Sequence, residues 1–118
     1  MERNEIEEAV DKSSCYITSS SGYQLYSKYW FPVGHPRALV FIAHGFAEHC
    51  MCFDDLAKTL ACHELLVFSH DHVGHGRSEG PRTLIGSIDD CVQDVLHHVD
   101  LVKVMYPGCP VFLLGNSM

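Results

Sequence analysis

The chain ends in a short motif that can carry nucleophilic chemistry. Its last residues, Gly115-Asn116-Ser117-Met118, match the first four positions of the pattern Gly-x-Ser-x-Gly. In that pattern a sharp turn from a strand into a helix exposes the serine hydroxyl, and the flanking residues are small because larger side chains would collide there. The motif therefore nominates Ser117 as a nucleophile and Gly115 as the residue that permits the turn.

A second loop, His44-Gly45-Phe46, can supply the backbone amides that acyl transfer needs. An oxyanion develops on the reacting carbonyl group, and two preorganised N–H groups commonly stabilise it, one from a His-Gly turn and one from the residue after the serine. The expected donors are the amides of Phe46 and Met118, with His44 and Gly45 supporting the turn. Taken alone, this loop also fits an ordinary glycine-enabled turn before a helix.

A third loop, residues 70–80, is rich in histidine and glycine, but it fits neither a metal site nor a nucleotide site. His70, His72 and His75 lie in one short segment without the spacing of a zinc site, so no metal and no cofactor are expected. A dinucleotide fingerprint fails because Glu79 stands where the third glycine belongs. The loop is expected to shape the rim of the site.

The elements that must position these loops predict an α/β fold. Residues 15–20 and 23–31 form a hairpin through Ser21-Gly22. Three apolar runs without alternation, typical of strands covered on both faces, follow at 37–43, 65–69 and 110–114. Helices are expected over 51–63 and from a capping box at Ser87 to Tyr106. Right-handed crossovers would then place the loops at the carboxyl ends of parallel strands, where ligands bind.

Two side-chain patterns on the second helix carry further expectations. Its buried stripe is expected to consist of five apolar residues: Ile88, Cys91, Val95, Val99 and Val102. His97 and His98 lie beside that stripe and are expected to be solvent-facing or hydrogen-bonded residues of the helix.

Length and charge exclude several classes of protein. The chain has 118 residues, 47% hydrophobic and 19% charged, which suits one globular domain. Eight basic against fifteen acidic residues give a net charge of −7, which disfavours nucleic acid and anionic membranes as electrostatically held partners. No apolar run approaches the roughly 18 residues of a membrane span.

The N-terminus and the cysteines indicate a location inside the cell. Residues 1–14 form an acidic arm, expected to be disordered, without the basic and apolar parts of a secretory signal. The six cysteines are then expected to be free thiols. The expected location is the cytoplasm, and peripheral contact with a membrane stays open.

Several stretches together resemble the monoacylglycerol lipases, serine hydrolases with the α/β-hydrolase fold, over nearly everything after residue 20. The stretches that carry the resemblance are 44–49, 65–76, 94–100 and 106–115. Shortened poxvirus-encoded relatives exist, and the chain is similar to those. The resemblance implies that Ser117 accepts the acyl group and that the amides of Phe46 and Met118 form the oxyanion hole. Two residues depart from the family: Asn116 replaces a usual histidine, and Phe46 replaces a small residue.

The family places its catalytic aspartate and histidine, and the lid, downstream of the serine. We therefore interpret residues 15–118 as the N-terminal portion of an incomplete α/β-hydrolase domain that ends at the nucleophile elbow and is inactive alone. The implied substrate is a monoacylglycerol or a related lipid ester. Two alternatives remain: a complementing half of a split hydrolase, and a non-catalytic module that binds a lipid or a protein. An uncovered last strand also predicts self-association or binding to a C-terminal fragment.

Overall fold

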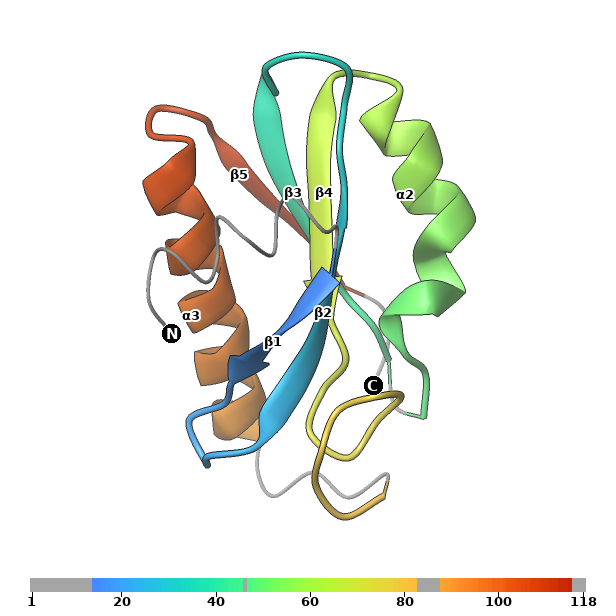
Figure 1. Cartoon of the computed structure of the whole chain (residues 1–118), viewed down its shortest axis with the longest axis vertical. Coiled ribbons are helices and arrows are strands. Elements are labelled where there is room, and N and C mark those ends of the chain that lie inside the picture. Colours follow the sequence, from blue (N-terminus) through green and yellow to red (C-terminus); the bar gives the residue numbers. More distant parts are fainter. Residues whose placement is uncertain (1–13, 46, 83–87, 116–118) are drawn as a thin grey trace.

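A computed structural model describes residues 14–45, 47–82 and 88–115 (Figure 1). It contains five strands, β1 (Ser14–Thr18), β2 (Gln24–Trp30), β3 (Ala38–Ala43), β4 (Leu65–His70) and β5 (Val111–Gly115), and three helical segments, η1 (Cys50–Phe53), α2 (Asp54–Ala61) and α3 (Ile88–Met105). Every strand and helix expected from the sequence is present. The arm up to residue 13 and the cap residue Ser87 lie outside the described residues, and Ser14 already belongs to β1.

The five strands form one mixed sheet in the order β1-β2-β4-β3-β5. Strand β3 lies between β4 and β5 and runs parallel to both. The hairpin strand β2 pairs antiparallel with β4, and β1 pairs antiparallel with β2. Residues 38–42 of β3 are all buried, as expected for an apolar run without alternation. The sheet therefore has the α/β arrangement that the sequence predicts.

Helices α2 and α3 cover opposite faces of this sheet (Figure 1). Val40 and Ile42 of β3 pack with Ala57 and Ala61 of α2. The alternate residues of β3, Leu39 and Phe41, pack with Val99 and Val102 of α3 on the other face. Successive side chains of a strand point to opposite faces, so one strand contributes to both cores.

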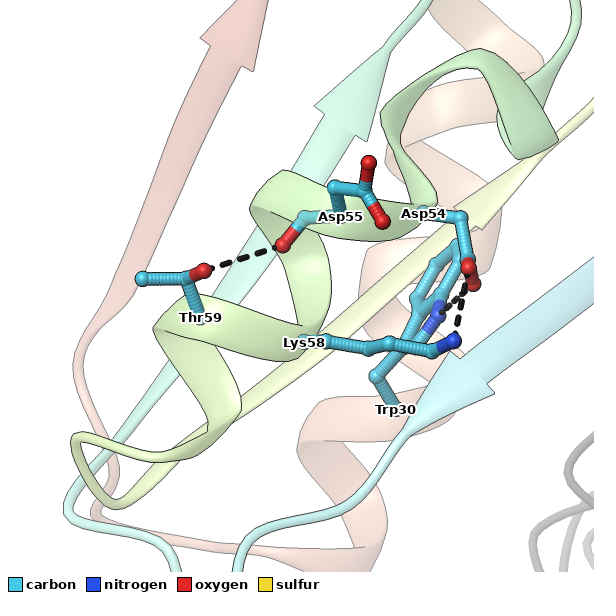
Figure 2. A network of polar contacts seen from close by, with 5 residues as sticks. All are labelled: Trp30, Asp54, Asp55, Lys58 and Thr59. Atoms are coloured by element: carbon cyan, nitrogen blue, oxygen red, sulfur yellow. Dashed lines mark hydrogen bonds and ion pairs between the residues drawn. The ribbon is translucent and has the colours of Figure 1, made fainter.

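The first turn of α2 is fixed to the sheet by a polar network (Figure 2). The indole Nε1 of Trp30 donates a hydrogen bond of 2.8 Å to Asp54 Oδ1. Lys58, one turn later, pairs with the other oxygen of the same carboxylate at 2.9 Å. An acidic residue in the first helical turn also interacts favourably with the helix dipole.

The expected buried stripe of α3 is right at its centre and wrong at its start. Cys91, Val99 and Val102 are buried and Val95 is half-buried, whereas Ile88 is 59% exposed. No described element lies over Ile88, which borders a groove between α3 and β5. Asp94 and His98 are buried instead, because each finds hydrogen-bond partners beneath the helix.

Strand β5 is an uncovered edge within the described part of the chain. Only β3 pairs with it, and Phe112, Leu113 and Leu114 are all exposed. An edge strand presents backbone N–H and C=O groups that no neighbouring strand pairs. Among the described residues, no helix is long and apolar enough to cross a membrane.

Candidate active site

The carboxyl ends of β3, β4 and β5 bring three loops to one edge of the sheet. Ala43, the last residue of β3, is paired with Gly115, the last residue of β5. Ile42 is paired with Ser69 of β4 on its other side. The His44-Gly45 turn therefore starts one strand spacing from the 70–80 loop on one side and one strand spacing from the end of β5 on the other. Phe46, Ser117 and Met118 lie outside the described residues.

Two hydrogen bonds between Gly45 and Glu48 close the His-Gly turn. The N–H of Gly45 donates to Glu48 Oε1 at 2.6 Å, and the N–H of Glu48 donates to the Gly45 carbonyl oxygen at 3.1 Å. Ala47 has a φ of 62°, in the left-handed region that non-glycine residues seldom adopt.

Glu48 was not among the residues nominated from the sequence. Its spacing of three residues from Gly45 could have identified it, because an acidic side chain that reaches back to an amide three residues earlier is one half of a capping box. A hydrogen bond to a charged acceptor is also stronger than one to a neutral acceptor. Glu48 thus holds the turn that the oxyanion-hole assignment requires.

His44 is a structural link between the loops. The imidazole is fully buried; its Nδ1–H donates to the Gly45 carbonyl oxygen at 2.7 Å, and its Nε2 accepts the N–H of His72 at 2.9 Å. Because a carbonyl can only accept and an amide N–H can only donate, these bonds fix the tautomer. Burial lowers the pKa of His44 to about 4. With both nitrogens engaged, the ring supports the turn and has no lone pair left for a nucleophile.

His72, in the 70–80 loop, makes a reciprocal contact with His44. Its Nε2–H donates to the His44 carbonyl oxygen at 3.1 Å, and the two ring centroids are 4.2 Å apart. Its Nδ1 is buried without a hydrogen-bond partner among the described residues. Burial is also the main cause that lowers the pKa of His72, so this ring is a weak base at neutral pH.

Asp71 joins the rim loop to the start of η1. Its carboxylate is buried; Oδ1 accepts the N–H of Cys50 at 2.6 Å and Oδ2 accepts the N–H of Arg77 at 2.9 Å. Its carbonyl oxygen accepts the Ser78 hydroxyl at 2.6 Å. Gly76 has a positive φ of 49° and leaves no room for a side chain beside this carboxylate. The 70–80 loop is therefore compact, and Asp71 is the residue that tightens it.

A second polar group lies beneath the site, inside the core. His98 of α3 places Nε2 2.8 Å from the Tyr29 hydroxyl and Nδ1 3.0 Å from Nδ1 of His70. Burial lowers the pKa of His98 to about 3 and lowers that of His70 as well. His97, in contrast, is exposed. Among the described residues, no cluster of three or more histidine, cysteine, aspartate or glutamate side chains could hold a metal ion.

All six cysteines lie in described segments, and none of them forms a disulfide in this structure. Burial raises the pKa of the Cys50 thiol, with the neighbouring Asp71 carboxylate acting in the same direction. The Cys50 thiol is therefore unreactive, and its role is to pack in the core at the start of η1.

Comparison with known proteins assigns the sequence to a family. Residues 34–118 match the Hydrolase_4 family, described as serine aminopeptidase, S33. The chain is 48% identical over 103 residues to human monoglyceride lipase, covering 87% of this chain and 34% of that protein. It is 48% identical over 106 residues to the monoglyceride lipase homolog of Monkeypox virus, covering 90% of this chain and 38% of that protein.

A shorter viral relative and a solved structure extend the comparison. Protein K6 of Vaccinia virus (strain Western Reserve) is 51% identical over 57 residues, which are 48% of this chain and 70% of that protein. A thermostable carboxyl esterase from Bacillus coagulans has a TM-score of 0.81 at 24% identity, over 89% of this chain and 36% of the esterase, and so supports the fold. The chain spans about a third of the length of the monoglyceride lipases that it matches. It belongs to the Hydrolase_4 family, and its sequence is similar to a part of the monoglyceride lipases.

Proposed function

We propose that this chain supplies the nucleophile and the oxyanion hole of a monoacylglycerol ester hydrolase. The observation that carries the proposal is the pairing of Ala43 with Gly115. Because of this pairing, the His44-Gly45 turn and the serine motif begin side by side at the ends of neighbouring strands. An oxyanion hole needs one amide from each of these two segments. Ser117 is the proposed nucleophile, and the amides of Phe46 and Met118 are the proposed oxyanion donors.

The proposed reaction is a two-step acyl transfer. The Ser117 hydroxyl attacks the ester carbonyl and loses its proton to a general base, and the C–O bond to glycerol breaks as glycerol takes up a proton. Water then hydrolyses the acyl-serine, which releases the fatty acid and restores the hydroxyl. The two amides stabilise the negative charge on the carbonyl oxygen in both steps.

We further propose that the 118 residues alone do not catalyse this reaction. His44 and His72 are the histidines at the site edge, yet both nitrogens of His44 are engaged, and His72 is held by the His44 carbonyl oxygen. Serine needs a hydrogen-bonded base that a third group orients. By resemblance, the base and its aspartate come from a segment downstream of the serine, so the chain acts as one half of a hydrolase site.

A turnover assay with the missing half supplied separately tests this proposal. The chain is mixed with the part of the Monkeypox virus homologue that lies beyond the aligned region, and hydrolysis of a monoacylglycerol is followed by fatty acid release. We expect no activity from either part alone and measurable activity from the mixture. The matched control is a mixture that carries Ser117→Ala, which should be inactive. Equal activity in the two mixtures would overturn the assignment of Ser117.

A non-catalytic binding role is the competing function. It predicts that the mixture stays inactive although the two parts form a stable complex, a result that size-exclusion chromatography of the same samples would reveal.

A further inference from the structure

Two hydrogen bonds join His44 and His72 in a closed ring of contacts. The N–H of His72 donates to His44 Nε2 at 2.9 Å, and His72 Nε2–H donates to the His44 carbonyl oxygen at 3.1 Å. Each residue therefore takes part with its main chain and with its side chain. Both side chains are buried, where the low dielectric strengthens these bonds.

This pair continues the connection between β3 and β4 beyond the end of their backbone pairing. The last registered pair of the two strands is Ile42 with Ser69. After that pair both segments leave the sheet as loops, and the bonds between His44 and His72 hold the two loops together. The imidazole of His72 thus takes the place of a backbone partner for the His44 carbonyl oxygen.

The clamp by Glu48 is a different kind of contact. Its two bonds with Gly45 close the turn, but both partners belong to the same loop. They fix the shape of the turn without fixing its position on the sheet. His72 follows β4, so its bonds with His44 anchor the turn to a neighbouring strand.

From His44 the contacts reach the peptide group that carries the proposed oxyanion donor. His44 Nδ1–H donates to the Gly45 carbonyl oxygen at 2.7 Å. The carbonyl of Gly45 and the N–H of Phe46 belong to one peptide group, and a peptide group is planar. A contact that holds the carbonyl therefore also determines the direction of the N–H that follows it.

We propose that His72 is a positioning residue for the ester hydrolysis proposed above. His72 holds the imidazole and the carbonyl of His44, the imidazole holds the Gly45 carbonyl, and the planar peptide group then aims the Phe46 amide at the developing oxyanion. Preorganised donors of this kind are worth most in the transition state. The catalytic consequence rests on the proposed function, whereas the hold on the turn is a property of this chain alone.

Two substitutions of His72 form a matched pair. His72→Gln keeps an N–H donor, because the side-chain amide nitrogen of glutamine can take the place of Nε2. His72→Phe keeps a ring but removes the donor. Both variants retain the backbone N–H that donates to His44 Nε2. A difference between them therefore reports the single bond to the His44 carbonyl oxygen.

Hydrogen exchange measures the hold on the turn without any catalysis. The amide of Glu48 donates to the Gly45 carbonyl oxygen, so its exchange reports opening of the turn. In the full 118-residue chain, His72→Phe should raise the exchange rate of this amide about tenfold, whereas His72→Gln should stay within about threefold of the wild type. Equal rates in the two variants would overturn the proposal.

An inhibitor that forms an oxyanion measures the catalytic consequence. The chain is mixed with the part of the Monkeypox virus homologue beyond the aligned region, and an alkyl trifluoromethyl ketone is the probe. The Ser117 oxygen adds to the ketone carbon, the hydroxyl proton passes to the general base, and the carbonyl oxygen becomes an oxyanion. The inhibition constant Ki therefore depends on the oxyanion hole, whereas KM for the monoacylglycerol reflects mainly ground-state binding.

The two constants separate a positioning role from a role in folding. His72→Phe should raise Ki about tenfold with KM unchanged, and His72→Gln should restore Ki to near the wild-type value. A loss of folded protein lowers the maximal rate but changes neither constant. A wild-type Ki in His72→Phe would overturn the positioning role.

The two measurements also distinguish this inference from the proposed function. An inactive wild-type mixture would contradict the proposed function, and the exchange rates then decide alone about the hold of His72 on the turn. If circular dichroism shows that His72→Phe does not fold, His72→Leu, a smaller residue without a donor, replaces it. If neither folds while His72→Gln does, the bond holds the fold as a whole, and the proposal is overturned.

Discussion

The buried histidines predict a loss of stability at mildly acidic pH. His98 is enclosed between Tyr29 and His70, and burial, with a smaller contribution from His97, lowers its pKa to about 3. Burial lowers the pKa of His44 to about 4. Both rings therefore stay neutral in the folded chain at pH 5.5, whereas an unfolded histidine titrates near 6.5.

The magnitude follows from linkage between protonation and folding. The unfolded chain binds more protons below about pH 6.5, so the free energy of unfolding falls as the pH falls from that value toward the folded pKa. Between pH 7.5 and 5.5 each of the two rings lowers this free energy by about 1.4 kcal/mol, or about 2.7 kcal/mol together. The pKa of His70 is shifted in the same direction and adds to the loss. The total free energy of unfolding of a typical domain is only about 5–15 kcal/mol.

Urea unfolding followed by far-UV circular dichroism at the two pH values measures this loss. His98→Gln should be less stable at both, but its loss between pH 7.5 and 5.5 should be smaller than the wild-type loss by about 1.4 kcal/mol. His97→Gln, on the exposed neighbouring residue, is the control and should keep nearly the full loss. If His98→Gln kept the wild-type pH dependence, or if both variants reduced the loss of the free energy of unfolding equally, burial of a neutral His98 would not be the cause of the loss.

Three substitutions test other parts of the account. Gly76→Ala should lower the free energy of unfolding by about 1–3 kcal/mol in thermal or urea unfolding, because the added Cβ would lie 2.8 Å from that of His49 and collide with the Asp71 carboxylate; wild-type stability would contradict the tight-loop geometry. Glu48→Gln keeps an acceptor but loses its charge, so the Gly45 amide should exchange hydrogen about fivefold faster, a change of about 1 kcal/mol; unchanged exchange would exclude the side-chain clamp. Phe112→Lys puts a charge on the open edge of β5 and should increase the monomer fraction in size-exclusion chromatography; an unaltered profile would contradict the prediction that the chain associates with itself through this edge.

The framework of the fold was predictable because its signals are local. The run 38–42 is apolar at every position, and that pattern alone indicates a strand covered on both faces. Ser21-Gly22 marked the hairpin, and the alternation of strands and helices marked the parallel sheet. The prediction that Ile88 at the start of α3 is buried was wrong, because the helical spacing of apolar residues is the same whether or not another element covers them.

The polar interior was not predictable, since its partners are far apart in the sequence. His98 is buried because the hydroxyl of Tyr29, 69 residues away, meets its ring. Asp71 is held by the amide of Cys50, 21 residues earlier, and a backbone amide leaves no mark in the sequence. At the site itself, the pairing of Ala43 with Gly115 agrees with the two-loop hypothesis, whereas the roles of Phe46, Ser117 and Met118 stay predictions.

Covalent labelling of Ser117 tests whether this residue is the nucleophile and whether it needs a base from a downstream segment. The chain is treated with a fluorophosphonate probe, alone and together with the downstream part of the Monkeypox virus homologue, and the labelled residue is identified by mass spectrometry. The account predicts negligible labelling of the chain alone and labelling at Ser117 in the mixture, because only the mixture contains an oriented general base. Stoichiometric labelling of Ser117 in the isolated chain, or labelling of the mixture at a different residue of this chain, would contradict it.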